Sequence, residues 1–189
     1  MSAPEASCEP LTPERAALLA GLFQQDPQCA ECWCMNHRCP DGAAPVHDAA
    51  REAFLRGVAA GEVHGVVALR SGACVGWCAV DPLAAQVGHD YVLASRTVEP
   101  GDWTIHCLFV APEARGQGLS GRLIEAAEAY ARARGATRLL AFPIPDANRA
   151  RFPAHEAEFA GRHASYARRG FADLPALDAF YAVVAKPLA

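Results

Sequence analysis

The sequence lacks the long apolar segment of a membrane helix, because no run of about 18 uncharged apolar residues occurs in its 189 residues. A basic excess is also missing: 17 Lys and Arg residues stand against 21 Asp and Glu residues, which gives a net charge of −4. This balance does not favour general nucleic-acid binding. The first ten residues have neither the basic start nor the apolar core of a secretion signal. We therefore expect a cytoplasmic protein with no membrane or nucleic-acid partner, whose eight cysteines are reduced thiols.

The composition is that of a globular protein. Apolar residues make up 52% of the chain and charged residues 20%. A chain of this length corresponds to about one domain, so we expect residues 1–189 to form a single domain that can bury a core of its own.

The most informative stretch runs from Trp103 to Leu123. Its first part, Trp103–Val110, is a short apolar run that predicts a buried strand. A turn follows at Arg115–Gly118, and from Leu119 onward apolar residues recur every four positions, which predicts a helix. A strand that leads into a helix through a small-residue loop gathers unpaired backbone N–H groups at the positive end of the helix dipole. The stretch therefore predicts an anion site, most often one for phosphate.

Spacing narrows the choice of phosphate ligand. The chain has neither a Walker loop nor the glycine spacing of the Rossmann fingerprint. Instead, Val110-Ala111-Pro112 is followed by Arg115-x-x-Gly118-x-Ser120, which resembles the pyrophosphate loop of the GCN5-related N-acetyltransferase (GNAT) family. Ser120 replaces a final Gly or Ala of that motif, and it is small enough to leave room for a diphosphate. An ordinary strand–turn–helix without a ligand is the alternative.

The resemblance, which covers about residues 10–186, implies a fold and a reaction. The fold is α/β, with a mixed and mostly antiparallel central sheet flanked by helices and a splayed pair of parallel central strands. The cosubstrate is acetyl-coenzyme A, the acceptor is an amine of a small molecule or a peptide, and no metal is expected. Family members are often dimers, so a homodimer is compatible with the resemblance. The implied cofactor contacts are Leu108, Phe109, Val110, Arg115, Gly116, Gln117, Gly118, Leu119 and Ser120.

A second family signature lies at Tyr166-Ala-Arg-Arg-Gly170-Phe171. In the family this Tyr often protonates the departing thiolate of coenzyme A, and a phenol with a pKa of about 10 suits that role. Tyr166 is therefore a candidate acid, although it could also be only a packed helix residue. The family often has an Asn seven residues earlier, where this chain has Phe159.

The sequence offers several candidates for the base that accepts the proton of the amine. A lysine-like amine needs a base, because only about one molecule in two to three thousand is neutral at pH 7. His106 lies in the predicted strand and is our candidate, with its side chain expected on the opposite face from Cys107. A buried core histidine is the alternative interpretation. His89, Asp90, Asp102 and Glu113 are further candidates.

Four cysteines and a histidine fall between Cys29 and Cys39, in a segment expected between the first two helices. A zinc site is one interpretation, but structural zinc sites usually draw ligands from two separated knuckles. The other interpretation is a thiol-lined wall near the acceptor pocket. The alternative function of another class is a regulatory or sensor module that binds coenzyme A and uses these cysteines as a redox or metal switch.

The remaining patterns predict elements around this centre. Thr12 and Pro13 begin a helix whose apolar face includes Leu18, Leu19, Leu22 and Phe23. We expect strands at Ser7–Leu11, Val63–Leu69, Cys74–Val80, Arg138–Ile144, Ala172–Leu174 and Ala179–Lys186. Further helices are expected at His47–Ala60 and Glu156–Arg169, and Leu83–Asp102 is expected to be a loop that contributes to the acceptor site or lies on the surface.

Overall fold

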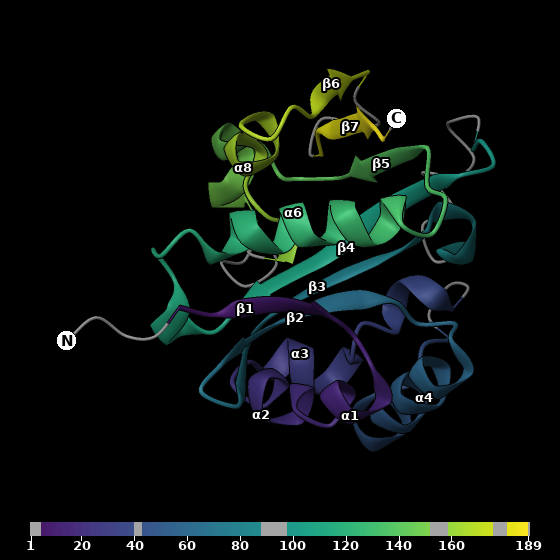
Figure 1. Ribbon diagram of the computed structural model, residues 1–189, viewed down its shortest axis with the longest axis vertical. Coiled ribbons are helices and arrows are strands. Elements are labelled where there is room, and N and C mark those ends of the chain that lie inside the picture. Colours follow the sequence, from purple (N-terminus) through teal and green to yellow (C-terminus); the bar gives the residue numbers. More distant parts are fainter. Residues whose placement is uncertain (1–4, 40–42, 88–97, 152–158, 176–180, 189) are drawn as a thin grey trace.

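A mixed sheet runs through the protein and carries helices on both faces (Figure 1). The computed structural model describes residues 5–39, 43–87, 98–151, 159–175 and 181–188. The described strands lie in the order β1-β2-β3-β4-β5-β7-β6, and every neighbouring pair is antiparallel except β4 and β5. Their bounds are β1 (Ser7–Pro10), β2 (Gly65–Arg70), β3 (Ala73–Pro82), β4 (Asp102–Val110), β5 (Arg138–Ala141), β6 (Ala172–Leu174) and β7 (Val183–Pro187). The expected fold class is confirmed.

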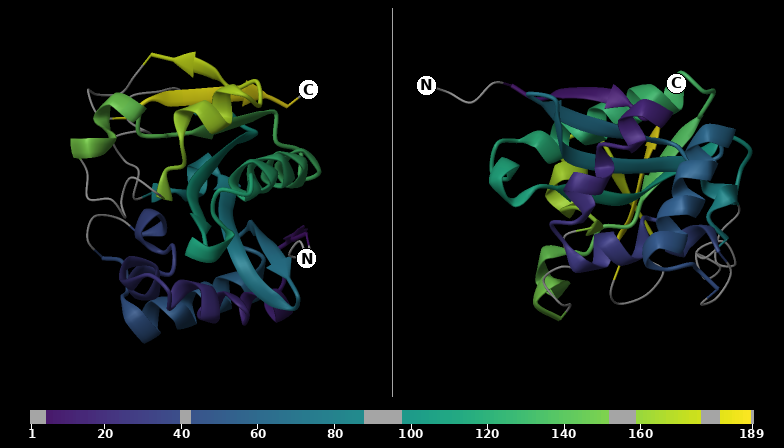
Figure 2. Two further views of the ribbon diagram at one scale, coloured as in Figure 1. Left: turned by 90° about the vertical axis from the view of Figure 1, so that its left-hand side faces the viewer. Right: turned by 90° about the horizontal axis from the view of Figure 1, so that it is seen from below.

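The helices form two groups on opposite sides of the sheet (Figure 2). The N-terminal group consists of α1 (Pro13–Ala16), α2 (Leu19–Phe23), α3 (Pro27–Cys32), η1 (Asn36–Arg38) and α4 (His47–Ala60). The other side is covered by α6 (Leu119–Arg132), with α8 (His163–Ala167) near its start. Short 3-10 turns are η2 (Leu83–Ala85), η4 (Pro112–Ala114) and η5 (Asp146–Arg151). Among the described residues, none of the helices combines the length and hydrophobicity that crossing a bilayer requires.

Two consecutive residues of β3 show how the sheet separates the two groups. The Trp77 ring packs on the N-terminal side, with its centroid 6.4 Å from that of Phe23 and 5.8 Å from that of Phe54. A Cβ on Gly76 would instead lie 2.9 Å from the Leu123 side chain of α6. Because successive side chains of a strand point to opposite faces, one strand can support both halves of the core.

The first predicted helix is shorter than expected. Thr12 caps it as predicted, because its hydroxyl accepts the Arg15 N–H at 3.3 Å. The chain then leaves the helix at Ala17, since the Leu18 N–H bonds the Arg15 carbonyl three residues back, and α2 begins anew at Leu19. Leu18 is 39% exposed, so its predicted place on the apolar face is wrong.

The last predicted helix, Glu156–Arg169, is wrong at its centre. Gly161 has a φ of +71°, a left-handed conformation that interrupts an α-helix, and α8 begins only at His163. Residues 152–158 lie outside the described part of the chain. Residues 88–97 and 176–180 also lie outside it, so the candidates His89 and Asp90 are not placed by the structure.

The parallel pair β4 and β5 separates along its length. Their pairing runs from Asp102 with Arg138 to Ile105 with Ala141. Beyond Ile105, β4 continues to Val110 with no partner strand on this edge among the described residues. The chain after β5 turns away, and Ile144 bridges Arg162 instead. The predicted splay is therefore present, and the strand predicted to reach Ile144 ends at Ala141.

Gly65 allows a close contact that stabilises the sheet. A Cβ at this position would lie 2.1 Å from the fully buried ring of Trp77 and 2.7 Å from the Cys78 carbonyl oxygen. We predict that Gly65→Ala lowers the free energy of unfolding by about 2 kcal/mol, the usual magnitude for overpacking a core.

Gly21→Ala in α2 is the matched control, because nothing lies within 4 Å of its Cβ position. The same substitution there should leave stability unchanged or raise it by up to about 1 kcal/mol, as expected for a helical glycine. Urea denaturation of both variants checks the prediction. Equal unfolding midpoints for the wild type and Gly65→Ala would contradict it.

Candidate functional site

A cavity of about 350 Å³ opens along the edge of β4 that β5 leaves unpaired. It contains every predicted cofactor contact except Gln117, and it adds residues from the segments around η5 and α8. Its lining residues are Leu108, Phe109, Val110, Ala114, Arg115, Gly116, Gly118, Leu119, Ser120, Arg149, Gly161, Arg162 and Ser165. We call it the donor cavity.

The glycine loop shapes one end of the donor cavity. Gly116 and Gly118 have φ values of 73° and 74°, and nothing lies within 4 Å of the Cβ position of either residue. Gly118 is the N-cap residue of α6, so the unpaired N–H groups of the first helical turn lie next to this open space. The geometry suits an anion, because these N–H groups and the helix dipole both favour negative charge.

Three arginines make the donor cavity positive. Arg115 lies in the glycine loop, where its Nε–H donates to the Val110 carbonyl at 3.0 Å. Arg149 and Arg162 approach from the chain that follows β5. No carboxylate is among the described residues that line the cavity. Sequence reasoning missed these two arginines, because their proximity to the glycine loop depends on the separation of β4 from β5.

Gln117 has a different role from its neighbours. Its side-chain oxygen accepts a hydrogen bond from the Arg70 guanidinium at 2.7 Å, and its side-chain N–H donates one to the Glu113 carbonyl at 3.1 Å. The side chain therefore braces the loop against the β2–β3 hairpin, and it is not part of the lining of the donor cavity.

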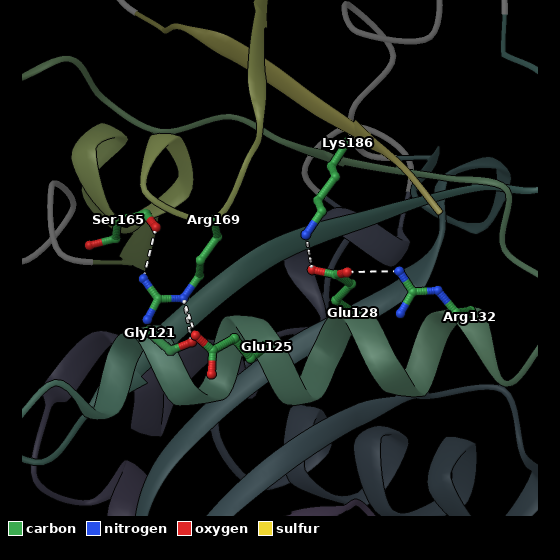
Figure 3. A network of polar contacts seen from close by, with 7 residues as sticks. All are labelled: Gly121, Glu125, Glu128, Arg132, Ser165, Arg169 and Lys186. Carbon is green, nitrogen blue, oxygen red and sulfur yellow. Dashed lines mark hydrogen bonds and ion pairs between the residues drawn. The ribbon is translucent and has the colours of Figure 1, made fainter. Parts of the chain in front are cut away.

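Arg169 ties the start of α6 to the end of α8 (Figure 3). Its Nε–H donates to the Gly121 carbonyl at 2.8 Å and lies 3.1 Å from the Glu125 carboxylate, while Nη1 donates to the Ser165 carbonyl at 3.0 Å. A Cβ on Gly121 would lie 1.8 Å from the guanidinium, so the glycine makes room for it. The contacts join α8 to the first turn of α6, and both elements line the donor cavity.

Tyr166 is fully buried and does not line the donor cavity itself. Its hydroxyl donates to the Ala160 carbonyl at 3.3 Å and lies behind Gly161, whose Cβ position is 3.1 Å from the phenol oxygen. Burial raises the pKa of Tyr166 well above its usual value, so the phenol keeps its proton. Gly161 lines the cavity, as does Leu108, whose side chain lies 3.2 Å from the same Cβ position.

His106 occupies a β-bulge in β4. Ile105 pairs with Val80 and Cys107 with Ala79, so His106 is an extra residue with no counterpart on β3. A bulge interrupts the alternation of side chains along a strand. As a result His106 and Cys107 line the same small cavity, and the prediction that they point to opposite faces is wrong.

This small cavity, which we call the inner chamber, has a volume of about 60 Å³. The segment Cys29–Cys39 forms most of its wall and so lies beside β4. Phe159 belongs to the chamber and packs against Phe109 of the donor cavity, with ring centroids 5.6 Å apart. The lining residues are Gln28, Cys29, Cys32, Cys34, Asn36, His37, His106, Cys107 and Phe159.

The cysteine segment reaches the chamber through an unusual turn. Trp33 and Cys34 have φ values of 45° and 54°, in the left-handed region that non-glycine residues rarely adopt. Packing holds the turn in place: Trp33 is buried against Phe23, and the Trp77 indole N–H donates to the Cys34 sulfur at 3.2 Å. Two successive left-handed residues next to a cavity are the kind of backbone strain that often marks a functional site.

A charged pair lies beneath His106. The Asp81 carboxylate is 3.7 Å from His106 Nε2, which allows an electrostatic interaction but is too long for a direct hydrogen bond. Asp81 also pairs with Arg38 of η1 and accepts the His64 backbone N–H at 3.0 Å. Burial raises the pKa of Asp81 to about 6, although Arg38 opposes the shift. The ring of His37 packs edge-on against that of His106, with centroids 5.7 Å apart.

The chamber thiols are poor nucleophiles. Cys34 and Cys107 share a hydrogen bond, which raises the pKa of Cys34 and by itself would lower that of Cys107, but burial leaves both pKa values raised. Burial likewise raises the pKa of Cys29. Thiols in this state remain protonated at neutral pH. Within the described ranges, no three His, Cys, Asp or Glu side chains come together in a way that could hold a metal ion.

Two other candidate bases lie away from the chamber lining. Asp102 stands at the opposite end of β4, where both of its oxygens accept hydrogen bonds from the Arg138 guanidinium. Glu113 belongs to η4, beside the glycine loop. Of the candidate bases that the structure describes, only His106 lines the chamber.

Comparison with known proteins agrees with the expected family. The sequence model of the acetyltransferase (GNAT) family matches residues 28–160. A search of curated proteins found no significant match. Similar solved structures include an N-acetyltransferase from Staphylococcus aureus Mu50, which is 13% identical with a TM-score of 0.58 and coverage of 98% of this chain and 100% of that one.

Two further structures show the same fold. A ribosomal-protein-alanine N-acetyltransferase from Brucella melitensis is 18% identical with a TM-score of 0.58. The match covers 96% of this chain and 99% of that one. A phosphinothricin acetyltransferase from Sinorhizobium meliloti, solved in complex with AcCoA, is 16% identical with a TM-score of 0.58. The match covers 98% of this chain and 90% of that one. At these identities the likeness establishes the fold alone.

Gly118 allows the anion site to be tested without weakening the helix. Asp and Asn are both good N-cap residues and both tolerate the left-handed conformation, so Gly118→Asp and Gly118→Asn should fold. The two side chains have nearly the same shape, but only Asp adds a negative charge beside the loop. We predict that Gly118→Asp weakens coenzyme A binding at least about tenfold more than Gly118→Asn does.

Isothermal titration of each variant with coenzyme A checks this prediction, and thermal unfolding shows that the fold is retained. If Gly118→Asp binds coenzyme A as tightly as the wild type does, the loop is not the anion site.

Proposed function

This chain belongs to the acetyltransferase (GNAT) family, and we propose that it transfers the acetyl group of acetyl-coenzyme A to an amine by direct attack. The observation that carries the proposal is the meeting of two cavities at one strand. Leu108 to Val110 of β4 line the donor cavity, and the preceding residues of the same strand, His106 and Cys107, line the inner chamber. A donor and an acceptor bound in these cavities would meet where β4 loses its partner.

The donor cavity fits the diphosphate and the pantetheine arm of coenzyme A. The first-turn N–H groups of α6 and the arginines Arg115, Arg149 and Arg162 suit the negative charge of the diphosphate. The edge of β4 from Leu108 to Val110 offers backbone groups that an amide-containing arm can pair with, as an added strand would. Acetyl-coenzyme A, when bound, supplies a thioester carbonyl as the group that the amine attacks.

We assign the base to His106. An attacking amine must be neutral, and the proton it loses needs an acceptor. His106 is the imidazole where the two cavities meet, and the Asp81 carboxylate lies 3.7 Å from its Nε2. Arg38 pairs with this carboxylate, so the negative charge near the imidazole is held in place by groups that do not themselves line the chamber.

We assign the acid to Tyr166. A phenol that keeps its proton throughout the physiological pH range can supply it to a departing thiolate. Its hydroxyl lies 3.1 Å from the Cβ position of Gly161, a residue of the donor-cavity wall. Gly161 carries no side chain to separate the hydroxyl further from the cavity.

The alternative function, a coenzyme A sensor with a cysteine switch, receives less support. A redox switch needs accessible thiolates, whereas burial raises the pKa of Cys29, Cys34 and Cys107. The same cysteines have a sufficient role as small apolar groups in the chamber wall.

Replacement of His106 tests the base. We predict that His106→Gln lowers kcat at least about 100-fold, because general base catalysis typically contributes at least that much. The affinity for coenzyme A, measured by titration, should not change. His64→Gln is the control, because His64 is hydrogen-bonded to Tyr130 and lines neither cavity. Equal rates of thiol release by His106→Gln and the wild type would remove His106 as the base.

Replacement of Tyr166 tests the acid. Tyr166→Phe deletes one hydroxyl and keeps the edge-on packing against Phe171, so the fold should persist. We predict that kcat of this variant falls about tenfold or more. Because the pKa of Tyr166 is raised, the wild type should lose no activity through tyrosinate formation below about pH 10. A pH–rate profile of both proteins checks this. An undiminished rate across the profile would leave Tyr166 with a packing role only.

A further inference from the structure

A third cavity lies next to the inner chamber. It has a volume of about 450 Å³, and we call it the vestibule. Three residues line both spaces, namely Gln28, Cys32 and Asn36, so the vestibule and the chamber share a wall. The other residues of the vestibule are Asp26, Pro27, Glu31 and Val46. The two cavities are therefore neighbours, and a ligand that spanned both would reach from the vestibule to His106.

The vestibule and the donor cavity carry opposite charges. Three arginines and no carboxylate are among the described residues of the donor cavity, as expected for an anionic donor. Two carboxylates, Asp26 and Glu31, and no basic side chain are among those of the vestibule. Since cavities lined by one sign of charge concentrate ligands of the opposite sign, the vestibule favours a cation.

We propose that the acceptor is a primary amine on an unbranched arm that carries a second positive charge. The reacting amine lies in the inner chamber beside His106, and the second cation lies in the vestibule between Asp26 and Glu31. This inference rests on the proposed acetyl transfer and adds the class of acceptor to it.

The inner chamber limits the shape and the charge of the reacting end. Its volume of about 60 Å³ makes it the smallest of the three cavities. A space of this size favours a slim aminoalkyl end over a branched or aromatic amine. Burial lowers the pKa of His37 to about 4 and keeps the thiols protonated, so these lining groups are neutral at pH 7. A neutral lining admits the neutral amine that the reaction requires and disfavours an ammonium ion.

The vestibule suits the charged end because its carboxylates are not neutralised. Glu31 is exposed and forms no ion pair with any described residue. Asp26 caps α3 with one oxygen, which accepts the N–H groups of Gln28 and Cys29 at 2.9 and 3.2 Å, and its second oxygen remains for a ligand. Gln28 adds a buried side-chain oxygen that has no hydrogen-bond partner in the described part of the chain. This oxygen is an acceptor on the path between the two ends.

Three amines of equal length separate the effect of the second charge from that of the arm. Each has one primary amine at the reacting end, and the far end is an ammonium, a methyl group or a carboxylate, as in a diaminoalkane, an aminoalkane and an ω-amino acid. We expect kcat/KM for coenzyme A release, expressed per neutral reacting amine, to decrease in that order for the wild type. One arm length should be best, because the chamber and the carboxylates lie at fixed positions.

Removal of the carboxylate charges should abolish this order. Glu31→Gln and Asp26→Asn should each reduce the advantage of the diamine over the aminoalkane by about fivefold, the upper range for an exposed ion pair. Asn keeps the N-cap of α3, so Asp26→Asn should retain the fold. Glu62→Gln is the matched control, because Glu62 lies just after the opposite end of α4 from Val46 and lines none of the three cavities. It should preserve the wild-type order.

The outcomes distinguish this inference from the proposed function. If all three amines release coenzyme A equally well, or if the diamine keeps its advantage in both variants, the acceptor class is wrong and the acetyl transfer stands. A preference for peptide α-amines would also contradict it. If no amine in the series and no peptide amine releases coenzyme A, the proposed function itself fails.

Discussion

The site depends on the point at which the parallel strands β4 and β5 stop pairing. β4 and β5 are hydrogen-bonded only as far as Ile105 and Ala141, and from there β4 continues alone. The unpaired backbone edge becomes a wall of the donor cavity, and the diverging chain brings Arg149 and Arg162 to face the glycine loop. The bulge at His106 occurs at the same point, and it turns the imidazole and the Cys107 thiol toward the N-terminal helices. One local departure from sheet geometry thus places the donor wall and the candidate base side by side.

Rigid supports surround this departure. Arg169 ties α8 to the first turn of α6, and Glu128 of α6 binds Lys186 of β7 at 2.7 Å (Figure 3). On the other face, the aromatic cluster around Trp77 holds the strained turn at Trp33 and Cys34 against the sheet. A site that must position two reactants benefits from such support, because small misplacements of reacting groups are costly in rate.

Much of the donor side could be predicted from the sequence, because it depends on local patterns. The glycine loop, the helix that follows it and the buried strand before it each have a short-range signature between Trp103 and Arg132, and the structure shows all three. The acceptor side depends on long-range register. A one-residue bulge at His106 leaves no mark in the hydrophobic pattern, and the left-handed Gly161 resembles any other glycine near a helix. The neighbourhood of the cysteine segment and β4 likewise exists only after folding, so its role in the chamber could not be read from spacing.

The most direct test of the central claim, that donor and acceptor meet where β4 and β5 part, is a crystal structure with coenzyme A bound. We expect the diphosphate at Gly116–Leu119, the pantetheine arm along the β4 edge at Leu108–Val110, and the sulfur directed toward the inner chamber at His106. Coenzyme A bound at another surface, or in the donor cavity with its sulfur directed away from His106, would contradict the claim.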